Sequence, residues 1–344
     1  MTETAQPTHA CTTFEAIQSL LTSTRLLVEP TQRVVFDTLP AEVRHVAGFH
    51  LGWWDADGGN KPAGGGKAIR PVMTLTCARA AGGPAHAAIS AAVAVELVHD
   101  FSLLHDDIMD SDPTRRHRPA AWAAFGVPRA LLTGDALLVS ALQLVNSGTA
   151  GEVLRAAVLE LCAGQAHDLA FEHRVDVRLP ECLRMAEQKT GALFGAACEL
   201  GALSVTDDLP VAGWYRQFGR QLGIAFQLID DVLGIWGCES VTGKPVYSDL
   251  RSRKKSLPVV AALTSGTAAG RELAALYART DALTEDELSD AAGLVESAGG
   301  RAWAEAEAAR RRHHALDVLG TANPDPSAAD DLRALADSIT TRVR

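Results

Sequence analysis

The chain has 344 residues, of which 47% are hydrophobic, 22% charged and only 5% aromatic. Its formal net charge of −10 argues against nucleic acid as the main partner, because binding a phosphate backbone needs a basic face, but it does not exclude small phosphates held in a local basic pocket. Length alone suggests roughly two domains of about 150 residues, although a large helical fold can exceed that size as one unit.

Apolar residues recur at three- and four-residue intervals along most of the chain, which is typical of helices, and strand-like alternation is missing. The clearest segments, rich in Ala and Leu, are residues 87–104, 129–145 and 152–171. The Gly- and Pro-rich loops between helices are residues 55–71, 109–119, 237–249 and 319–331. This pattern predicts an all-α fold, most economically one helical bundle over residues 1–344 with ligand sites in its core.

The N-terminus lacks the basic and apolar regions of a secretory signal, and we expect residues 1–20 to form a flexible segment. The longest apolar run, residues 87–104, is interrupted by Glu96, His99 and Asp100, so no segment reaches the roughly 18 apolar residues of a membrane span. Six scattered cysteines without a CxxC pair indicate reduced thiols, with no zinc site or disulfide framework. These features predict a cytoplasmic protein without a transmembrane segment.

An acidic cluster and a basic cluster stand side by side in HDDIMDSDPTRRHRP (105–119). Asp106 and Asp110 are four residues apart, so on a helix they share a face and repel each other. Hard oxygen ligands of this kind suit Mg²⁺, which often bridges carboxylates to substrate phosphates. For this motif alone, a solvated acidic helix end is an equally good interpretation.

A second acidic pair, Asp230 and Asp231, lies in the apolar run 224–237. Carboxylates in an apolar helix are costly unless they are paired or bind a metal. Two such helices that face each other would hold a shared group of cations. The second pair therefore favours a metal site over two unrelated surface patches.

Basic residues accompany these acidic clusters in the neighbouring loops. They are Lys67 and Arg70 after three glycines, Arg115 and Arg116 after the first cluster, and Lys244 with residues 251–255 after the second. Any one of them alone is best explained as a solvated surface charge. Together they indicate a polyanion held both through metals and through direct ion pairs.

These residues resemble the trans-prenyltransferases, the isoprenyl diphosphate synthases of the polyprenyl synthetase family. The matching elements are GGGKAIRP (64–71), ELVHDFSLLHDDIMD with its arginine pair (96–116), GQAHD (164–168), QKTGALF (188–194), FQLIDDVLGIWG (226–237) and TGKPVYSDLRSRKKSLP (242–258). The resemblance implies an isoprenoid synthase-type helical bundle around a central active-site cavity, usually paired as a homodimer. It implies condensation of isopentenyl diphosphate with an allylic diphosphate (dimethylallyl, geranyl or farnesyl).

The resemblance also implies a role for individual residues. The expected ligands of three Mg²⁺ ions on the allylic diphosphate are Asp106, Asp110 and Asp230. The residues expected to contact that diphosphate directly are Arg115, Lys189, Lys244 and Lys254. Those expected to bind isopentenyl diphosphate are Lys67, Arg70, His99 and Arg116. Thr190 and Gln227 are expected to present oxygens to the allylic cation, and Asp168 to hold metal-bound water.

Product length follows, in the family, from the residues five and four positions before the first aspartate, here Phe101 and Ser102. A Phe followed by a small Ser implies medium chains, with geranylgeranyl diphosphate (C20) first and farnesyl diphosphate (C15) next. The alternative for Phe101 is ordinary core packing.

The chain departs from the family pattern at three notable positions. Gly234 replaces the third aspartate of the second acidic motif, from which we expect retained activity with weaker metal binding. His117 and Tyr247 stand where glycine is usual, and the bulk of Tyr247 is expected to slow closure of its loop.

Two other functions share parts of the pattern. A class I terpene cyclase would need an NDxxSxxxE-like second motif, whereas this chain has Gly234 and Cys238 at the relevant positions. A non-catalytic partner of an active synthase tends to lose the first aspartates or the isopentenyl pocket, and this chain keeps both.

Overall fold

The computed structural model describes residues 9–59, 66, 68–238 and 245–340, and these residues are almost entirely helical. The elements are α1 (His9–Asp37), α2 (Ala41–Leu51), α3 (Ile69–Ala80), η1 (Ala85–Ala88), α4 (Ile89–Met109), β1 (Thr114–Arg115), β2 (Arg118–Pro119), α5 (Ala121–Phe125), α6 (Val127–Leu144), α7 (Gly148–Glu172), α8 (Leu179–Ala186), η2 (Glu187–Gly191), α9 (Ala192–Leu203), α10 (Leu209–Trp236), α12 (Ser248–Arg251), α13 (Leu257–Leu263), α14 (Ala268–Tyr277), α15 (Glu285–Ser297), α16 (Gly300–Thr321) and α17 (Pro326–Thr340). The predicted all-α fold is confirmed.

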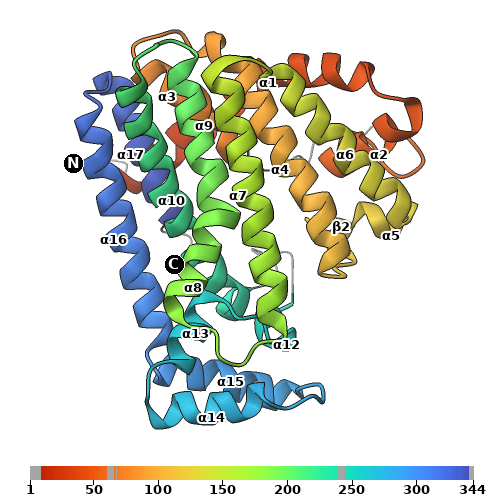
Figure 1. The fold of residues 1–344 in the computed structure, drawn as a ribbon, viewed down its shortest axis with the longest axis vertical. Coiled ribbons are helices and arrows are strands. Elements are labelled where there is room, and N and C mark those ends of the chain that lie inside the picture. The colour runs from red at the N-terminus through yellow and green to blue at the C-terminus, as the bar shows by residue number, and fades with distance from the viewer. Residues whose placement is uncertain (1–8, 60–65, 67, 239–244, 341–344) are drawn as a thin grey trace, which may run out of the picture.

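Long helices form the body of the bundle. In Figure 1, α7, α9, α10 and α16 run side by side, with α2, α5 and α6 to one side and α14 and α15 across the lower end. α10 packs along α9 and α16, α4 packs along α6, and α9 also contacts α3, α4 and α7. The helices α4, α7 and α10, which carry most of the predicted site residues, therefore surround or adjoin α9 near the middle of the fold.

The central position of α4 explains its composition. Every residue from Ala91 to Val98 is buried, because neighbouring helices cover this part of α4 on all sides, and all of these residues except Glu96 are apolar. Two helical segments, residues 85–109 and 127–144, are long and apolar enough by length and composition to cross a membrane. In the first, 72% of the apolar window is buried inside the protein, which identifies it as a core helix; in the second the share is 33%.

The segment over residues 1–20, which we expected to be flexible, overlaps the first helix. Helix α1 begins at His9, and Ile17 is buried in an apolar cluster that includes Phe218 and Leu332. α1 packs on α3, α4 and α17. These partners lie far away in the sequence, so the local composition of the segment could not reveal them.

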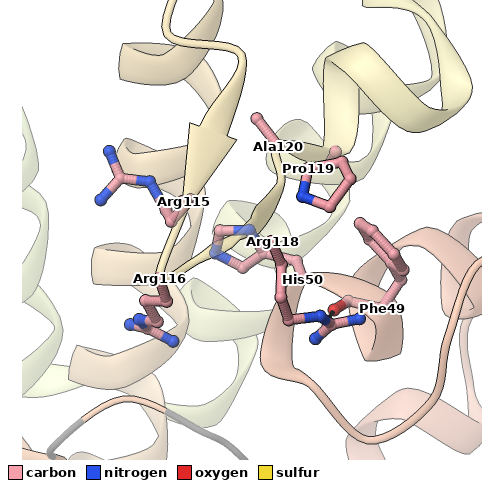
Figure 2. Close-up of a pocket in the computed structure, with 8 residues that line it drawn as sticks. Phe49, His50, Arg115, Arg116, Arg118, Pro119 and Ala120 are labelled. Carbon is pink, nitrogen blue, oxygen red and sulfur yellow. Dashed lines mark hydrogen bonds between the residues drawn. The ribbon is translucent and has the colours of Figure 1, made fainter. Parts of the chain in front are cut away.

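A small hairpin occupies the predicted loop 109–119, where no strand was expected. β1 pairs antiparallel with β2, with Arg115 opposite Arg118. Each strand has two residues, too few for an alternating pattern to show in the sequence. Arg118 anchors the hairpin to α2 and the turn that follows it, because its guanidinium donates to the carbonyl oxygens of Phe49 (3.1 Å) and Trp54 (3.0 Å). Figure 2 shows Arg115 and Arg116 pointing away from that anchor.

The turn of this hairpin gives His117 a physical context. Arg116 and His117 form its two-residue loop, and their φ angles are +52° and +60°. Positive φ at both positions is what a type I′ turn requires, and glycine adopts it without strain. Tyr247 also has a positive φ, +64°. Both positions at which the sequence replaces a usual glycine are therefore in the left-handed region.

We predict that His117→Gly stabilises the protein. A non-glycine residue in the left-handed region costs about 1–2 kcal/mol, and the larger backbone entropy of glycine in the unfolded chain offsets about 0.5–1 kcal/mol of the gain. The net increase in the free energy of unfolding is therefore about 0.5–1 kcal/mol, measured by thermal or urea unfolding at fixed protein concentration. Thr114→Gly, in the exposed strand of the same hairpin, is the matched control and should destabilise. An unchanged or lower unfolding midpoint for His117→Gly would contradict the claim that the backbone at His117 is strained.

Candidate active site

A cavity of about 590 Å³ opens among α3, α4, the hairpin, α7, η2, α10 and α12. Twelve residues expected from the sequence line it: Arg70, His99, Ser102, Asp106, Asp110, Arg115, Arg116, Lys189, Thr190, Gln227, Asp230 and Lys254. Phe101 and Asp168 are not among the lining residues, and Lys67 and Lys244 lie outside the described part of the chain. The structure thus brings the acidic and basic groups of distant motifs to one space.

Carboxylates from two helices face this cavity. Asp106 and Asp110 come from the last turn and C-cap of α4, and Asp230 comes from the C-terminal half of α10. Burial raises the pKa of Asp106, and the charge of Asp110 adds to this effect while Lys189 opposes it. A cation beside Asp106 would relieve this destabilisation of its charged form.

The donor set fits Mg²⁺ bound together with a phosphate ligand. Among the described residues, no three His, Cys, Asp or Glu side chains lie close enough to hold a metal ion alone. Mg²⁺ is usually bound through one or two carboxylates, with water and substrate phosphates completing its octahedron. Asp106 and Asp110 on α4 and Asp230 on α10 supply carboxylates of this kind to a cavity that has room for a diphosphate.

Asp107 has a different task from its neighbours. Its side chain is 1% exposed, and both of its oxygens accept hydrogen bonds from Arg115 Nε, at 2.7 and 2.9 Å. Arg115 Nη2 lies 2.6 Å from the same carboxylate. Asp107 therefore fixes the guanidinium of Arg115 at the cavity wall, through charge-assisted bonds that are stronger than neutral ones.

Arg70, His99 and Arg116 form a basic pocket in the same cavity. Arg70 is partly buried, its buried Nε has no hydrogen-bond partner among the described residues, and desolvation lowers its pKa to about 10. Burial, together with Arg70 and Arg116, holds the pKa of His99 well below its ordinary value, so this ring is neutral. An anion would satisfy the orphaned Arg70 donor and offset the cost of burying its charge.

The glycine-rich loop reaches the same pocket. A Cβ on Gly66 would overlap the guanidinium of Arg116, so a larger residue there would displace the tip of this side chain. The carbonyl oxygen of Gly66 accepts a hydrogen bond of 2.7 Å from Arg25 on α1. Sequence reasoning missed Arg25, because nothing in its local pattern connects α1 to the loop.

Glu96 is a second buried group that the sequence analysis did not assign to the site. It lines the cavity near Arg70, and burial raises its pKa to about 7, with Asp100 adding to the rise. Its position three residues before His99 on α4 places both side chains on the cavity face of the helix. The three-residue spacing between Glu96 and His99 is the sequence signal that could have placed Glu96 at the site.

Asp168 holds two lysines at the cavity edge. Its Oδ2 lies 2.7 Å from Lys189 Nζ and 3.8 Å from Lys254 Nζ. Burial alone would raise its pKa, but Lys254 and Lys189 together lower the pKa below the ordinary value. Asp168 thus gathers cations from η2 and from the segment after α12 at one point.

A chain of hydrogen bonds orients the polar groups on the apolar side of the cavity. Thr190 Oγ1 donates to Gln227 Oε1 at 2.6 Å, and Gln227 Nε2 donates to Asp231 Oδ1 at 2.7 Å. Asp231 Oδ2 accepts from the backbone N–H of Leu257 at 2.8 Å. Burial raises the pKa of Asp231 to about 7. Asp231 therefore supports Gln227 and the start of α13.

Another carboxylate lies where the second acidic motif lacks one. A Cβ on Gly234 would overlap the side-chain carboxylate of Asp249, which lines the cavity from α12. Asp249 is 15 residues downstream of Gly234, and no motif spacing connects the two. The loss of the third aspartate is therefore accompanied by a carboxylate that the following segment brings to the same place.

Of the two residues expected to set product length, one lines the cavity and the other packs in the core. Ser102 lines the cavity. Phe101 is 7% exposed in the core cluster of α4, and its ring packs edge-on against His105 with centroids 4.8 Å apart. Phe101 thus packs in the core next to the wall residue Ser102.

Comparisons with known proteins agree with this geometry. The sequence model of the family Polyprenyl synthetase matches residues 60–295. A (2E,6E)-farnesyl diphosphate synthase of Mycobacterium tuberculosis is 48% identical over 325 residues, covering 92% of this chain and 90% of that protein. A geranylgeranyl diphosphate synthase of the same species is 41% identical over 332 residues, with 94% of each chain covered.

Solved structures give the same result. The crystal structure of a polyprenyl synthetase from Streptomyces coelicolor A3(2) matches with a TM-score of 0.89 at 40% identity, covering 94% of this chain and 99% of that one. A geranylgeranyl pyrophosphate synthetase from Pyrococcus horikoshii matches with a TM-score of 0.84 at 32% identity, covering 95% and 98%. The chain belongs to the polyprenyl synthetase family, the all-α prenyltransferases that make isoprenyl diphosphates.

Proposed function

We propose that this protein condenses isopentenyl diphosphate with an allylic diphosphate (dimethylallyl, geranyl or farnesyl diphosphate) and releases inorganic diphosphate. The observation that carries the proposal is a single cavity lined both by carboxylates on α4 and α10 and by Arg70, His99 and Arg116. Such a cavity suits two diphosphates, of which one is held through cations and the other by direct ion pairs.

Asp106, Asp110 and Asp230 would hold Mg²⁺ at the allylic diphosphate, and we expect three ions per active site. When bound, these ions neutralise the charge that develops on the diphosphate as its bond to the allylic carbon breaks. Arg115, Lys189, Lys244 and Lys254 would add direct contacts to the same group. Two of these basic side chains, Arg115 and Lys189, are held in place before the substrate binds by Asp107 and Asp168, respectively.

The condensation then follows from charge and position. Arg70, His99 and Arg116, with Lys67, would hold isopentenyl diphosphate so that its double bond faces the allylic carbon. Thr190 and Gln227 would direct oxygen atoms at the allylic cation, in the orientation that Asp231 enforces. The electron pair of the double bond forms the new carbon–carbon bond, and the departing diphosphate accepts the proton that restores a double bond.

We propose geranylgeranyl diphosphate (C20) as the main product and farnesyl diphosphate (C15) as the next. The small Ser102 in the cavity wall supports the longer chain. The named relatives include synthases of both products.

We expect a cytoplasmic homodimer in which residues 1–344 form one domain. Helix α6 supports the dimer, because it exposes apolar side chains, among them Leu132 (62% exposed) and Val139 (55%). A second copy of the chain that covers this face would account for an apolar helix that is only partly buried.

We predict condensation in a defined mixture of purified protein, Mg²⁺, isopentenyl diphosphate and each allylic primer. Mass spectrometry should detect a prenyl diphosphate longer than the primer. Asp106→Asn should lower kcat by about 100-fold or more, because one ligand of the charge-neutralising cations is lost. The exposed Asp290→Asn on α15 serves as the matched control and should leave kcat unchanged. No condensation with any primer would contradict the proposal, and a cyclic hydrocarbon product would favour a terpene cyclase.

We predict opposite changes of product length from the two residues of the proposed floor. Ser102→Phe places a ring in the cavity wall and should shorten the product from C20 towards C15. Phe101→Ala removes the support behind that wall and should lengthen the product. Chain lengths are read by mass spectrometry after identical turnover. If both variants give the wild-type distribution, the floor lies elsewhere.

A further inference from the structure

The backbone that carries Lys189 and Thr190 is not an ordinary α-helix. Residues Glu187–Gly191 form a single π-helical turn between α8 and α9. A π turn is rarer and less favourable than α-helix, and it persists where the surrounding structure holds it. Whatever holds η2 therefore decides where the ammonium of Lys189 and the hydroxyl of Thr190 point.

One guanidinium connects the three elements that meet at this turn. Arg220 on α10 donates to both carboxylate oxygens of Glu160 on α7, at 3.1 and 2.7 Å. It also donates to Oε1 of Glu187, the first residue of η2, through Nε and Nη2 at 3.2 Å each. The Arg220 side chain is 17% exposed, so solvent screens these bonds only in part. The planar fork of arginine suits such a double contact, which the point charge of a lysine cannot reproduce.

Glycines bring the backbone of η2 close to the neighbouring helices. A Cβ on Gly223 of α10 would lie 2.8 Å from Gly191 Cα at the end of η2. A Cβ on Gly164 of α7 would overlap the backbone nitrogen of Lys189. Glycine allows this close approach but offers no side chain that interlocks, so it does not fix the register of the turn. Polar contacts do: Lys189 bonds to Asp168, Thr190 to Gln227 and Gln188 to His167. The Arg220 bonds add the contact at Glu187, where the turn begins.

We infer that Arg220 is a positioning residue, which holds the π turn so that Lys189 and Thr190 face the cavity. Arg220 is not among the described residues that line the cavity, so it acts through Glu187 and Glu160 and not on the substrate. The inference rests on the proposed function for what Lys189 and Thr190 do. The placement of the turn itself is independent of that function.

The test compares Arg220→Ala and Arg220→Lys with Arg216→Ala. Arg216 lies one turn earlier on α10. Its ion pair is with Glu199 of α9, at 3.8 Å, and not with a residue of η2. We expect Arg220→Ala to lower kcat by about 100-fold while KM for isopentenyl diphosphate stays within about threefold, because a small displacement of catalytic groups slows chemistry more than binding. Arg220→Lys should restore kcat only in part, and Arg216→Ala should resemble the wild type.

Hydrogen exchange separates this inference from the proposed function, because it needs no turnover. Amides of residues 187–191 should exchange faster in Arg220→Ala than in the wild type, while those of α15, which carries none of the partners of Arg220, stay unchanged. Unchanged exchange at 187–191, or a loss of kcat no larger than in Arg216→Ala, would overturn the positioning role. A wild-type protein without condensation activity would refute the proposed function alone, and the exchange result would still decide the role of Arg220.

Discussion

The structure depends most on the burial of charged groups of both signs in one cavity. Burial shifts the pKa of Asp106, Asp231 and Glu96 upwards and that of Arg70 downwards, which means that each charged form is destabilised where it lies. Native proteins tolerate such groups when partners or ligands offset the cost of desolvation. In this cavity the offset is incomplete at Arg70 Nε, and a bound anion with its cations would complete it.

Ion pairs within the protein prepare the site for this ligand. Asp107 fixes Arg115, Asp168 gathers Lys189 and Lys254, and Asp231 fixes Gln227, so four of the groups expected to act on substrate already have a supporting carboxylate. Groups held in advance lose little conformational freedom when the substrate binds, and they need little reorganisation when charge develops. The acidic residues at the cavity thus divide into those that face the ligand and those that position the basic and polar side chains that contact it.

The sequence predicted the all-α fold, the convergence of two acidic helices and twelve of the residues that line the cavity, because helical periodicity and ordered motifs are local signals. It did not predict the partners that depend on tertiary packing. Asp249 reaches Gly234 only because α12 folds back on α10, and Arg25 reaches Gly66 only because α1 packs beside the loop. The π turn and the two-residue strands left no periodic signal. The packing of α1 was not predicted either, because its partners α3, α4 and α17 lie elsewhere in the chain.

Calorimetric titration with inorganic diphosphate tests the central claim, that one cavity holds two diphosphates by different means. With Mg²⁺ the wild-type protein should bind two diphosphates per chain, and without Mg²⁺ only the one in the Arg70 and Arg116 pocket. Asp230→Asn should retain one site in the presence of Mg²⁺. The same number of sites with and without Mg²⁺, or an unchanged number in Asp230→Asn, would contradict the account.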